Sequence, residues 1–267
     1  MQRIIPLAVV GFVIVMVLGI LVMIVPSLRQ YGVRARCQNH MRLLAEDGIR
    51  NAAAPGRAPS MDAFREIPSG TVFNADLTPD ERMSWLVAVT LPLEAKGHCS
   101  GLHSQFSPLA VWDAAAHRSA IHSRVTVFLC PAAPPADDPN RPALTQYVGL
   151  TGLGQDSATL PIDHERAGAF RYNAPTPITA FRAGLSHTAT IAETNEDLGA
   201  WARGGHSTLR SLDASADAQL GRGRQFGGLH LEGTWFGFAD GSARLLTDST
   251  DPLVLRRQFT LAAEGSD

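Results

Sequence analysis

The chain has 267 residues, a formal net charge of −2 and 45% hydrophobic residues. Without its apolar N-terminal run it keeps roughly 230 residues, enough for one large or two small domains with a core. The balanced charge, with no basic patch, argues against a nucleic-acid partner. Glycine and proline are abundant, at 24 and 17 residues, which favours a β-rich body with many turns over a helical bundle.

An uncharged apolar run extends from Ile4 to Leu28. It is long enough to cross a bilayer as a helix, the conformation that satisfies its own backbone groups there. The run is too long for a signal peptide, and no small-residue cleavage site follows it. We therefore interpret residues 1–28 as an uncleaved, single-pass transmembrane anchor. A cleaved signal sequence and a helix buried in a soluble core are the alternatives.

Residues 29–54 are predicted to continue this helix as an amphipathic segment that packs on the body. The prediction rests on apolar residues that recur every three to four positions, namely Val33, Cys37, Met41, Leu44 and Ile49. The helix should end before Pro55-Gly56, within a breaker-rich linker over residues 52–60. Residues 55–267 then form one β-rich head.

Within the head, we expect a helix that starts at Pro79–Arg82 and a short one over 113–121, capped by Asp113. Strands are predicted over 125–129, 146–150, 169–172, 178–181 and 188–193. The Gly- and Ser-rich stretch 195–228 should be mostly loop. Residues 233–239 and 242–246 flank Asp240-Gly241, which predicts a hairpin with a type I′ turn and positive φ at both central residues.

His230 is followed by nine residues and then by Asp240-Gly241. This spacing resembles the "H-x9-DG" signature of a prepilin-like bacterial family, the planctomycete-type domain of unknown function 1559, and further segments resemble that family in the same order. Arg34–Leu44 resembles the family's segment after the membrane helix, and Val127–Pro131 its central Cys-Pro turn. Other matching pieces are Tyr147-Val148-Gly149, Gly168-Ala169-Phe170 and the strand-ending Glu193.

The resemblance implies an α+β, pilin-like fold, in which a long N-terminal transmembrane and amphipathic helix packs on a mainly antiparallel β-rich head. It also implies an extracytoplasmic, periplasmic head. By contrast, the arginines after the apolar run, Arg29, Arg34, Arg36 and Arg42, would by themselves keep the head in the cytoplasm. We give the resemblance more weight. Prepilins carry a glutamate five residues after the glycine of their leader, where this chain has Met16 after Gly11, so processing by a prepilin peptidase is not expected.

The signature residues His230, Asp240 and Gly241 are expected to be structural, because Asp-Gly is what a tight turn requires. Metal binding or catalysis by His230 and Asp240 is the alternative. His98, Cys99 and His103 have the side chains of a zinc site but lack a second ligand pair at defined spacing. Ser186-His187 and His206-Ser207 lack a nucleophile elbow, which argues against a hydrolase. We predict no catalytic residue, no metal and no cofactor.

The chain has three cysteines, Cys37, Cys99 and Cys130, so at least one has no partner within the chain. Cys37 and Cys130 can meet if the helix packs on the segment before Cys130. A disulfide between them is then possible outside the cytoplasm, although we favour two buried free thiols.

The sequence thus predicts a membrane-anchored, pseudopilin-like structural or interaction protein of the bacterial cell envelope, linked to a type II secretion or pilus-like assembly. Its expected partners are the membrane and either itself or other pilin-like secretion components. A tethered extracytoplasmic domain that binds a ligand, or that acts as a metal-dependent enzyme, is the alternative.

Overall fold

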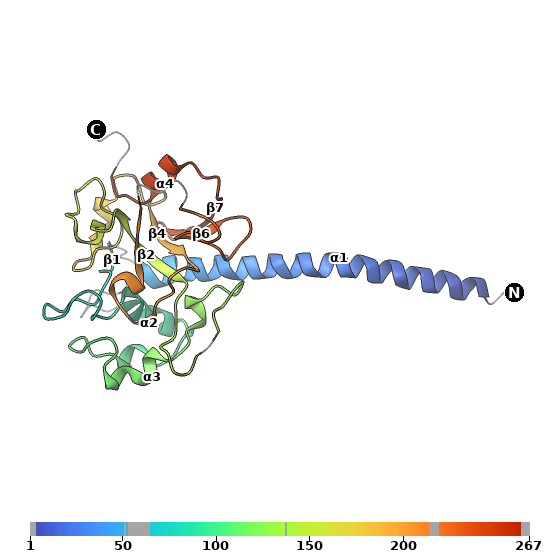
Figure 1. Cartoon of the computed structure of the whole chain (residues 1–267), viewed down its shortest axis with the longest axis horizontal. Helices are drawn as coiled ribbons and strands as arrows, with labels where there is room; N and C mark the ends of the chain where they lie inside the picture. Colours follow the sequence, from blue (N-terminus) through green and yellow to red (C-terminus); the bar gives the residue numbers. More distant parts are fainter. Residues whose placement is uncertain (1–3, 51, 53–64, 137, 214–218, 263–267) are drawn as a thin grey trace.

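A computed structural model describes residues 4–50, 52, 65–136, 138–213 and 219–262, and it has a long helix projecting from an α+β head (Figure 1). The helix α1 spans Ile4–Arg42 and continues as a π-helical turn, Leu43–Ile49. The fold-class prediction is confirmed, because the head is built on a mainly antiparallel sheet. Apart from Ala52, the predicted linker lies outside the described residues.

The main sheet has five strands in the order β5-β2-β4-β6-β7. The strands are β2 (Tyr147–Leu153), β4 (Ala189–Glu193), β5 (Leu209–Leu212), β6 (Thr234–Phe238) and β7 (Ala243–Leu246). All neighbours pair antiparallel except β5, which is parallel to β2. A separate two-stranded sheet pairs β1 (Glu66–Ile67) with β3 (Thr176–Pro177).

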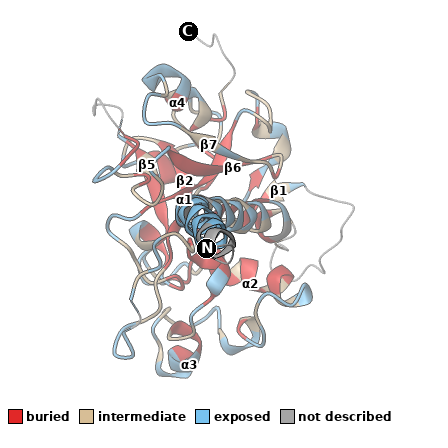
Figure 2. Ribbon diagram, turned by 90° about the vertical axis from the view of Figure 1, so that its right-hand side faces the viewer, coloured by how far each residue is buried: buried red, intermediate tan, exposed pale blue. Residues whose placement is uncertain are grey.

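Both faces of the main sheet are covered, because its strands carry apolar residues on either side. On one face, Ile191 and Trp235 join a core with α1 and with α2 (Trp85–Ala95). On the other, Phe236 and Phe238 pack with Phe259, next to α4 (Pro252–Gln258). Seen end-on, α1 lies between the sheet and the part of the head that holds α2 and α3 (Arg118–Ile121) (Figure 2).

The two halves of the N-terminal helix have different surroundings. Its second half buries Cys37, Met41, Leu44, Ala45 and Ile49, each at most 1% exposed, as the apolar stripe predicts. Helix and sheet come close because β6 has a glycine at position 237, where a Cβ atom would lie 3.1 Å from the Cβ of Ala45. The first half, by contrast, is exposed from residue 9 to residue 25. The interpretation of this run as a helix buried in a soluble core is therefore wrong.

Several predicted elements differ from the observed ones. Helix α2 begins at Trp85, where the Ser84 side chain accepts a hydrogen bond from Leu86, and not at Pro79. The short helix over 113–121 consists of a 3-10 turn, Ala115–His117, followed by α3, and Ala114 instead of Asp113 holds its N-cap position. The stretch 195–228, predicted as mostly loop, contributes strand β5.

Three strand predictions are wrong for one physical reason, which is that a strand needs a continuous ladder of partners. Residues 126–128 form a 3-10 turn, with hydrogen bonds from Phe128 to Val125 and from Leu129 to Thr126. Ile178–Ala180 is also a 3-10 turn. In 169–172, Phe170 bonds to Leu150 and Tyr172 to Ala158, so the partners belong to different segments. The predictions for β2, β4 and the β6-β7 hairpin are confirmed.

Candidate functional site at the helix–head junction

Asp240 and Gly241 form the turn between β6 and β7. Gly241 has a φ of +87°, whereas the described non-glycine residues with positive φ do not include Asp240. The N–H of Gly241 bonds to the carbonyl of Phe238, and the N–H of Phe238 bonds to the carbonyl of Ser242. This is a three-residue loop closed by one left-handed residue, not the type I′ turn predicted above. The Asp240 carboxylate supports the loop by accepting 2.9 Å and 2.6 Å bonds from the N–H and Oγ of Ser242.

His230 lies in the segment before β6 and contacts a different set of residues. Its Nε2 atom lies 3.4 Å from Sγ of Cys130 and 3.6 Å from Oε1 of Glu193. The contacts of Asp240, in comparison, include Leu185, Ser242, Arg244 and Arg50. The two halves of the signature thus have separate contacts, and a common site formed by His230 and Asp240 is not observed among the described residues.

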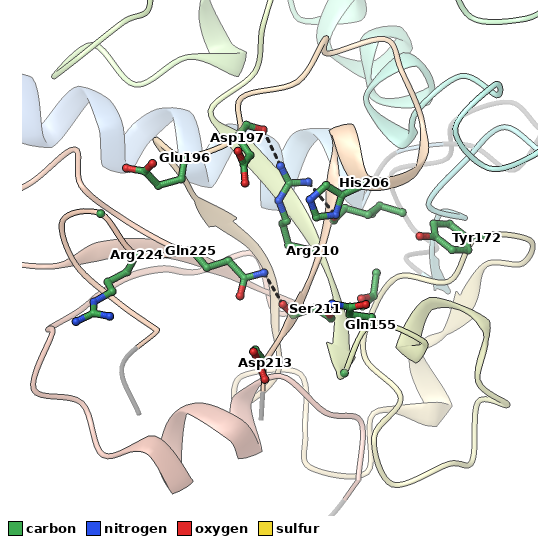
Figure 3. Close-up of a pocket in the computed structure, with 14 residues that line it drawn as sticks. Gln155, Tyr172, Glu196, Asp197, His206, Arg210, Ser211, Asp213, Arg224 and Gln225 are labelled. Atoms are coloured by element: carbon green, nitrogen blue, oxygen red, sulfur yellow. Dashed lines mark hydrogen bonds between the residues drawn. The ribbon is translucent and has the colours of Figure 1, made fainter. Parts of the chain in front are cut away.

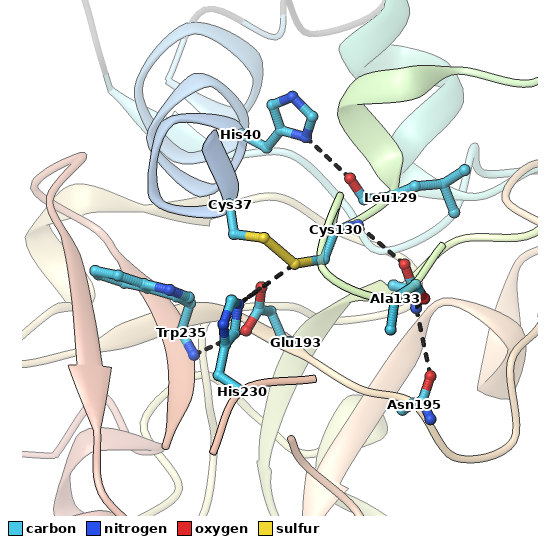
Figure 4. Close-up of polar contacts among 10 residues, drawn as sticks. Cys37, His40, Leu129, Cys130, Ala133, Glu193, Asn195, His230 and Trp235 are labelled. Carbon is cyan, nitrogen blue, oxygen red and sulfur yellow. Dashed lines mark hydrogen bonds and ion pairs between the residues drawn. A yellow bond between two sulfur atoms is a disulfide. The ribbon is translucent and has the colours of Figure 1, made fainter. Parts of the chain in front are cut away.

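Cys37 and Cys130 are joined by a disulfide bond, with 5.2 Å between their Cα atoms (Figure 4). Cys37 comes from the docked half of α1, and Cys130 follows the 3-10 turn of residues 126–128. The structure therefore has a covalent link between helix and head where we favoured two free thiols. A further hydrogen bond of 2.9 Å, from the ring of His40 to the carbonyl of Leu129, lies beside it.

Gln146 holds the Cys130 segment in place from the start of β2. Its Oε1 accepts a 2.9 Å bond from the N–H of Cys130, and its Nε2 donates a 2.7 Å bond to the carbonyl of Ala133. Gln146 is fully buried, so these bonds are shielded from competition with water. The position of the Cys130 sulfur is thus fixed by a side chain more than a dozen residues away in sequence.

Glu193 is the buried acid of this site. It ends β4, on the sheet face that carries α1, and it is 0% exposed. Its Oε2 accepts a 3.1 Å bond from the N–H of Trp235, but its Oε1 has no hydrogen-bond partner among the described residues. Burial raises the pKa of the Glu193 carboxyl above its ordinary value, while His230 and the Trp235 N–H act to lower it. A buried carboxylate oxygen without a hydrogen bond is energetically costly.

Tyr147 lies directly opposite Glu193 across the β2-β4 pair. Its hydroxyl is also buried without a hydrogen-bond partner among the described residues. Burial, and secondarily the charge of Glu193, raise the pKa of Tyr147 well above its ordinary value. In the sequence, Glu193 is recognisable only as an acid at the end of a predicted strand, and its burial becomes visible in the structure.

A second feature is an open polar cavity of about 970 Å³ beside β5 (Figure 3). Its wall contains the buried Arg210, whose Nη2 donates a 2.8 Å bond to the carbonyl of Asp197. Burial lowers the pKa of Arg210 to about 10. Other polar residues in the lining include Gln155, Glu196, Asp213, Arg224 and Gln225. The cavity offers hydrogen bonds of both kinds and suits a hydrophilic ligand.

The remaining sequence candidates do not form a site in the described part of the chain. Cys99 donates weakly to the carbonyl of Thr90, and the His103 ring contacts the carbonyl of Val87. Among the described residues, His98, Cys99 and His103 are not in the group that could hold a metal ion together, which is the junction cluster. The Ser186 hydroxyl lies 3.1 Å from the His187 ring at the exposed surface, while Ser207 donates to the carbonyl of Ala200.

A helix long and apolar enough to cross a membrane, whose second half is docked on a mainly antiparallel sheet, fits a membrane-anchored, pilin-like protein. Residues 27–214 match the family described as "Protein of unknown function (DUF1559)". The chain belongs to this family, and the match runs from the docked half of α1 to β5. It ends before His230, so the signature residues lie outside it. Neither the curated proteins nor the solved structures gave a match.

Proposed function

We propose that this protein is a structural subunit of the bacterial cell envelope, anchored by one transmembrane pass and active through assembly instead of catalysis. In this proposal, its partners are further copies of itself or other pilin-like secretion components, and its head lies outside the cytoplasmic membrane. The main support is the contrast along α1, whose second half is part of the core while residues 9–25 are exposed.

The apolar side chains of residues 9–25 are exposed, and lipid is the environment in which such side chains are stable. The docked half makes the helix a rigid extension of the head, through the disulfide and the ion pair between Arg34 and Glu232. In a subunit of this shape, a movement of the helix in the membrane would move the head with it.

Self-association of the span can be measured by cysteine cross-linking in native membranes, in a Cys99→Ser background. We expect Leu18→Cys or Leu21→Cys to give disulfide-linked dimers on mild oxidation. Leu109→Cys, at an 86% exposed position on the head, is the matched control for random collision. Equal cross-linking at all three positions, or none, contradicts assembly through the helix.

The orientation of the head needs a separate test. An alkaline phosphatase fused after Asp267 should be active, and a fluorescent protein that folds only in the cytoplasm should be dark at the same position. The opposite result would agree with the arginines that follow the apolar run and would remove the extracytoplasmic part of the proposal.

A tethered binding domain is the second candidate, and the polar cavity beside β5 favours it. Its mixed charges and amides suit a hydroxyl-rich ligand such as a glycan of the envelope. The two functions differ in their dependence on partners. A binding domain should keep its ligand affinity as a detergent-solubilised monomer, and Gln225→Ala should weaken that affinity without affecting cross-linking of the span.

A further inference from the structure

Four potential metal ligands meet at the helix–head junction. Cys37, Cys130, Glu193 and His230 each offer one donor atom, and these atoms all lie within 4.8 Å of one another. They come from α1, from the segment after residues 126–128, from the end of β4 and from the segment before β6. Three are fully buried and His230 is nearly so. The fold itself therefore brings together two sulfurs, an imidazole and a carboxylate.

Two distances in this cluster, both from the imidazole of His230, match those of a tetrahedral zinc site. With Zn–S bonds of about 2.3 Å and Zn–N or Zn–O bonds of about 2.0 Å, ligand atoms lie about 3.3 to 3.8 Å apart. The Nε2 atom of His230 lies 3.4 Å from Sγ of Cys130 and 3.6 Å from Oε1 of Glu193. The two sulfurs are bonded to each other here, so they have to separate before both can bind a metal.

The orphaned oxygen of Glu193 is an independent sign of a missing ligand. It is the same Oε1 atom that faces His230, and it has no hydrogen-bond partner among the described residues. The distance of 3.6 Å to the imidazole is too long for a hydrogen bond. A cation bound between Oε1, the imidazole and the sulfurs would satisfy this acceptor in a way that the disulfide form does not.

We propose that reduction of the Cys37–Cys130 disulfide creates a zinc site made of both thiolates, His230 Nε2 and Glu193 Oε1. A phosphine reductant breaks the S–S bond and leaves as its oxide with the oxygen of one water molecule, whose two protons complete the two thiols. A dithiol reductant instead transfers its own two hydrogens to the sulfurs and becomes a disulfide. Binding of Zn²⁺ then releases both thiol protons to solvent and forms two Zn–S bonds. The helix is held on the head by a covalent bond in one redox state and by a metal in the other.

Thiolate ligands favour zinc over magnesium or calcium, which prefer sites built from oxygen. The direct test uses the full-length protein in detergent, reduced with a phosphine and freed of metal by a chelator. Titration with Zn²⁺, followed by elemental analysis of the desalted protein, should give one zinc per reduced chain and none per oxidised chain. With Co²⁺ as probe, the reduced protein should show a sulfur-to-cobalt charge-transfer band and the intense visible bands of tetrahedral cobalt.

Variants assign the ligands. Cys130→Ser should abolish the charge-transfer band, and His230→Gln and Glu193→Gln should each weaken zinc at least about tenfold, since each removes one donor. Cys99→Ser is the matched control and should bind like the parent. Circular dichroism of each reduced variant shows whether it is folded. Glu193→Gln keeps the shape of the side chain, so it tests a metal ligand even if another variant fails to fold. Absence of zinc from the folded reduced parent, equal binding by the oxidised protein, or binding that survives Cys130→Ser each overturns the proposal.

Discussion

The guanidinium of Arg50 donates a 2.7 Å hydrogen bond to the main-chain carbonyl of Asp240. This contact ties the end of the N-terminal helical segment to the turn of the last hairpin, 190 residues away. Gly241 is part of the same contact, because a Cβ atom there would lie 3.2 Å from Nη1 of Arg50 and 3.2 Å from the Cβ of Glu46. Asp240 and Gly241 thus contact the end of the N-terminal helical segment, which is distant from them in the sequence.

Gly241→Ala should destabilise the protein in two ways, through backbone strain at its φ of +87° and through pressure on Arg50 and Glu46. Gly97→Ala is the matched control, because Gly97 has a φ of +78° but open space around its Cβ position. We expect about 1 kcal/mol for the control and about 2–3 kcal/mol for Gly241→Ala. Urea unfolding of the detergent-solubilised protein measures both, and equal losses would show that the helix end does not press on the turn.

Asp240→Asn should be nearly neutral, because an amide oxygen can still accept the hydrogen bonds from Ser242. What it loses is the 3.6 Å ion pair with Arg244, and such a partly exposed pair contributes about 0–1 kcal/mol. Asp240→Ala removes the acceptor altogether and should cost about 1–2 kcal/mol. The same unfolding assay applies. A loss in Asp240→Asn as large as that in Asp240→Ala would point to a role for the negative charge itself.

Leu44→Ala should cost about 2–5 kcal/mol, because Leu44 is 0% exposed where the helix enters the core. Leu109→Ala, at an 86% exposed position, should change the unfolding free energy by less than about 0.5 kcal/mol. Urea unfolding measures both variants.

A head that starts at residue 52 lacks the buried side chains of Cys37, Met41, Leu44, Ala45 and Ile49 and should be far less stable than one that starts at residue 27. Equal melting temperatures for the two heads would show that the helix does not contribute to the core.

Cys99 should react slowly with alkylating reagents. Burial, and secondarily Glu94, raise the pKa of its thiol from 9.0 to about 11, so the reactive thiolate is scarce at neutral pH. We expect the alkylation rate of the oxidised protein to rise about tenfold per pH unit from pH 7 to pH 10 without a plateau. The unfolded protein should level off near pH 9, and a plateau in the folded protein below pH 10 would contradict the raised pKa.

Elements whose signals are local can be predicted from the amino-acid sequence alone. An uncharged run of sufficient length defines the apolar helix, its apolar stripe defines the docked half, and Asp-Gly between two apolar runs defines the β6-β7 hairpin. The same kind of signal failed over residues 125–129. Their β-branched residues favour a strand, but no strand in the described part of the chain pairs with them, and residues 126–128 form a 3-10 turn.

The geometry of the helix–head junction depends on contacts between distant segments and cannot be predicted from local sequence patterns. Strand β5 is formed by parallel pairing with a strand some 60 residues earlier, and such pairings leave no local pattern in the sequence. The disulfide, the orphaned oxygen of Glu193 and the position of His230 depend on where the helix lies on the sheet. That position is set by the absence of a side chain at Gly237 and by the burial of Met41 and Leu44, which are contacts between segments far apart in the chain. The residue types of the site can be read from the sequence, but their meeting at one point is a property of the packed core.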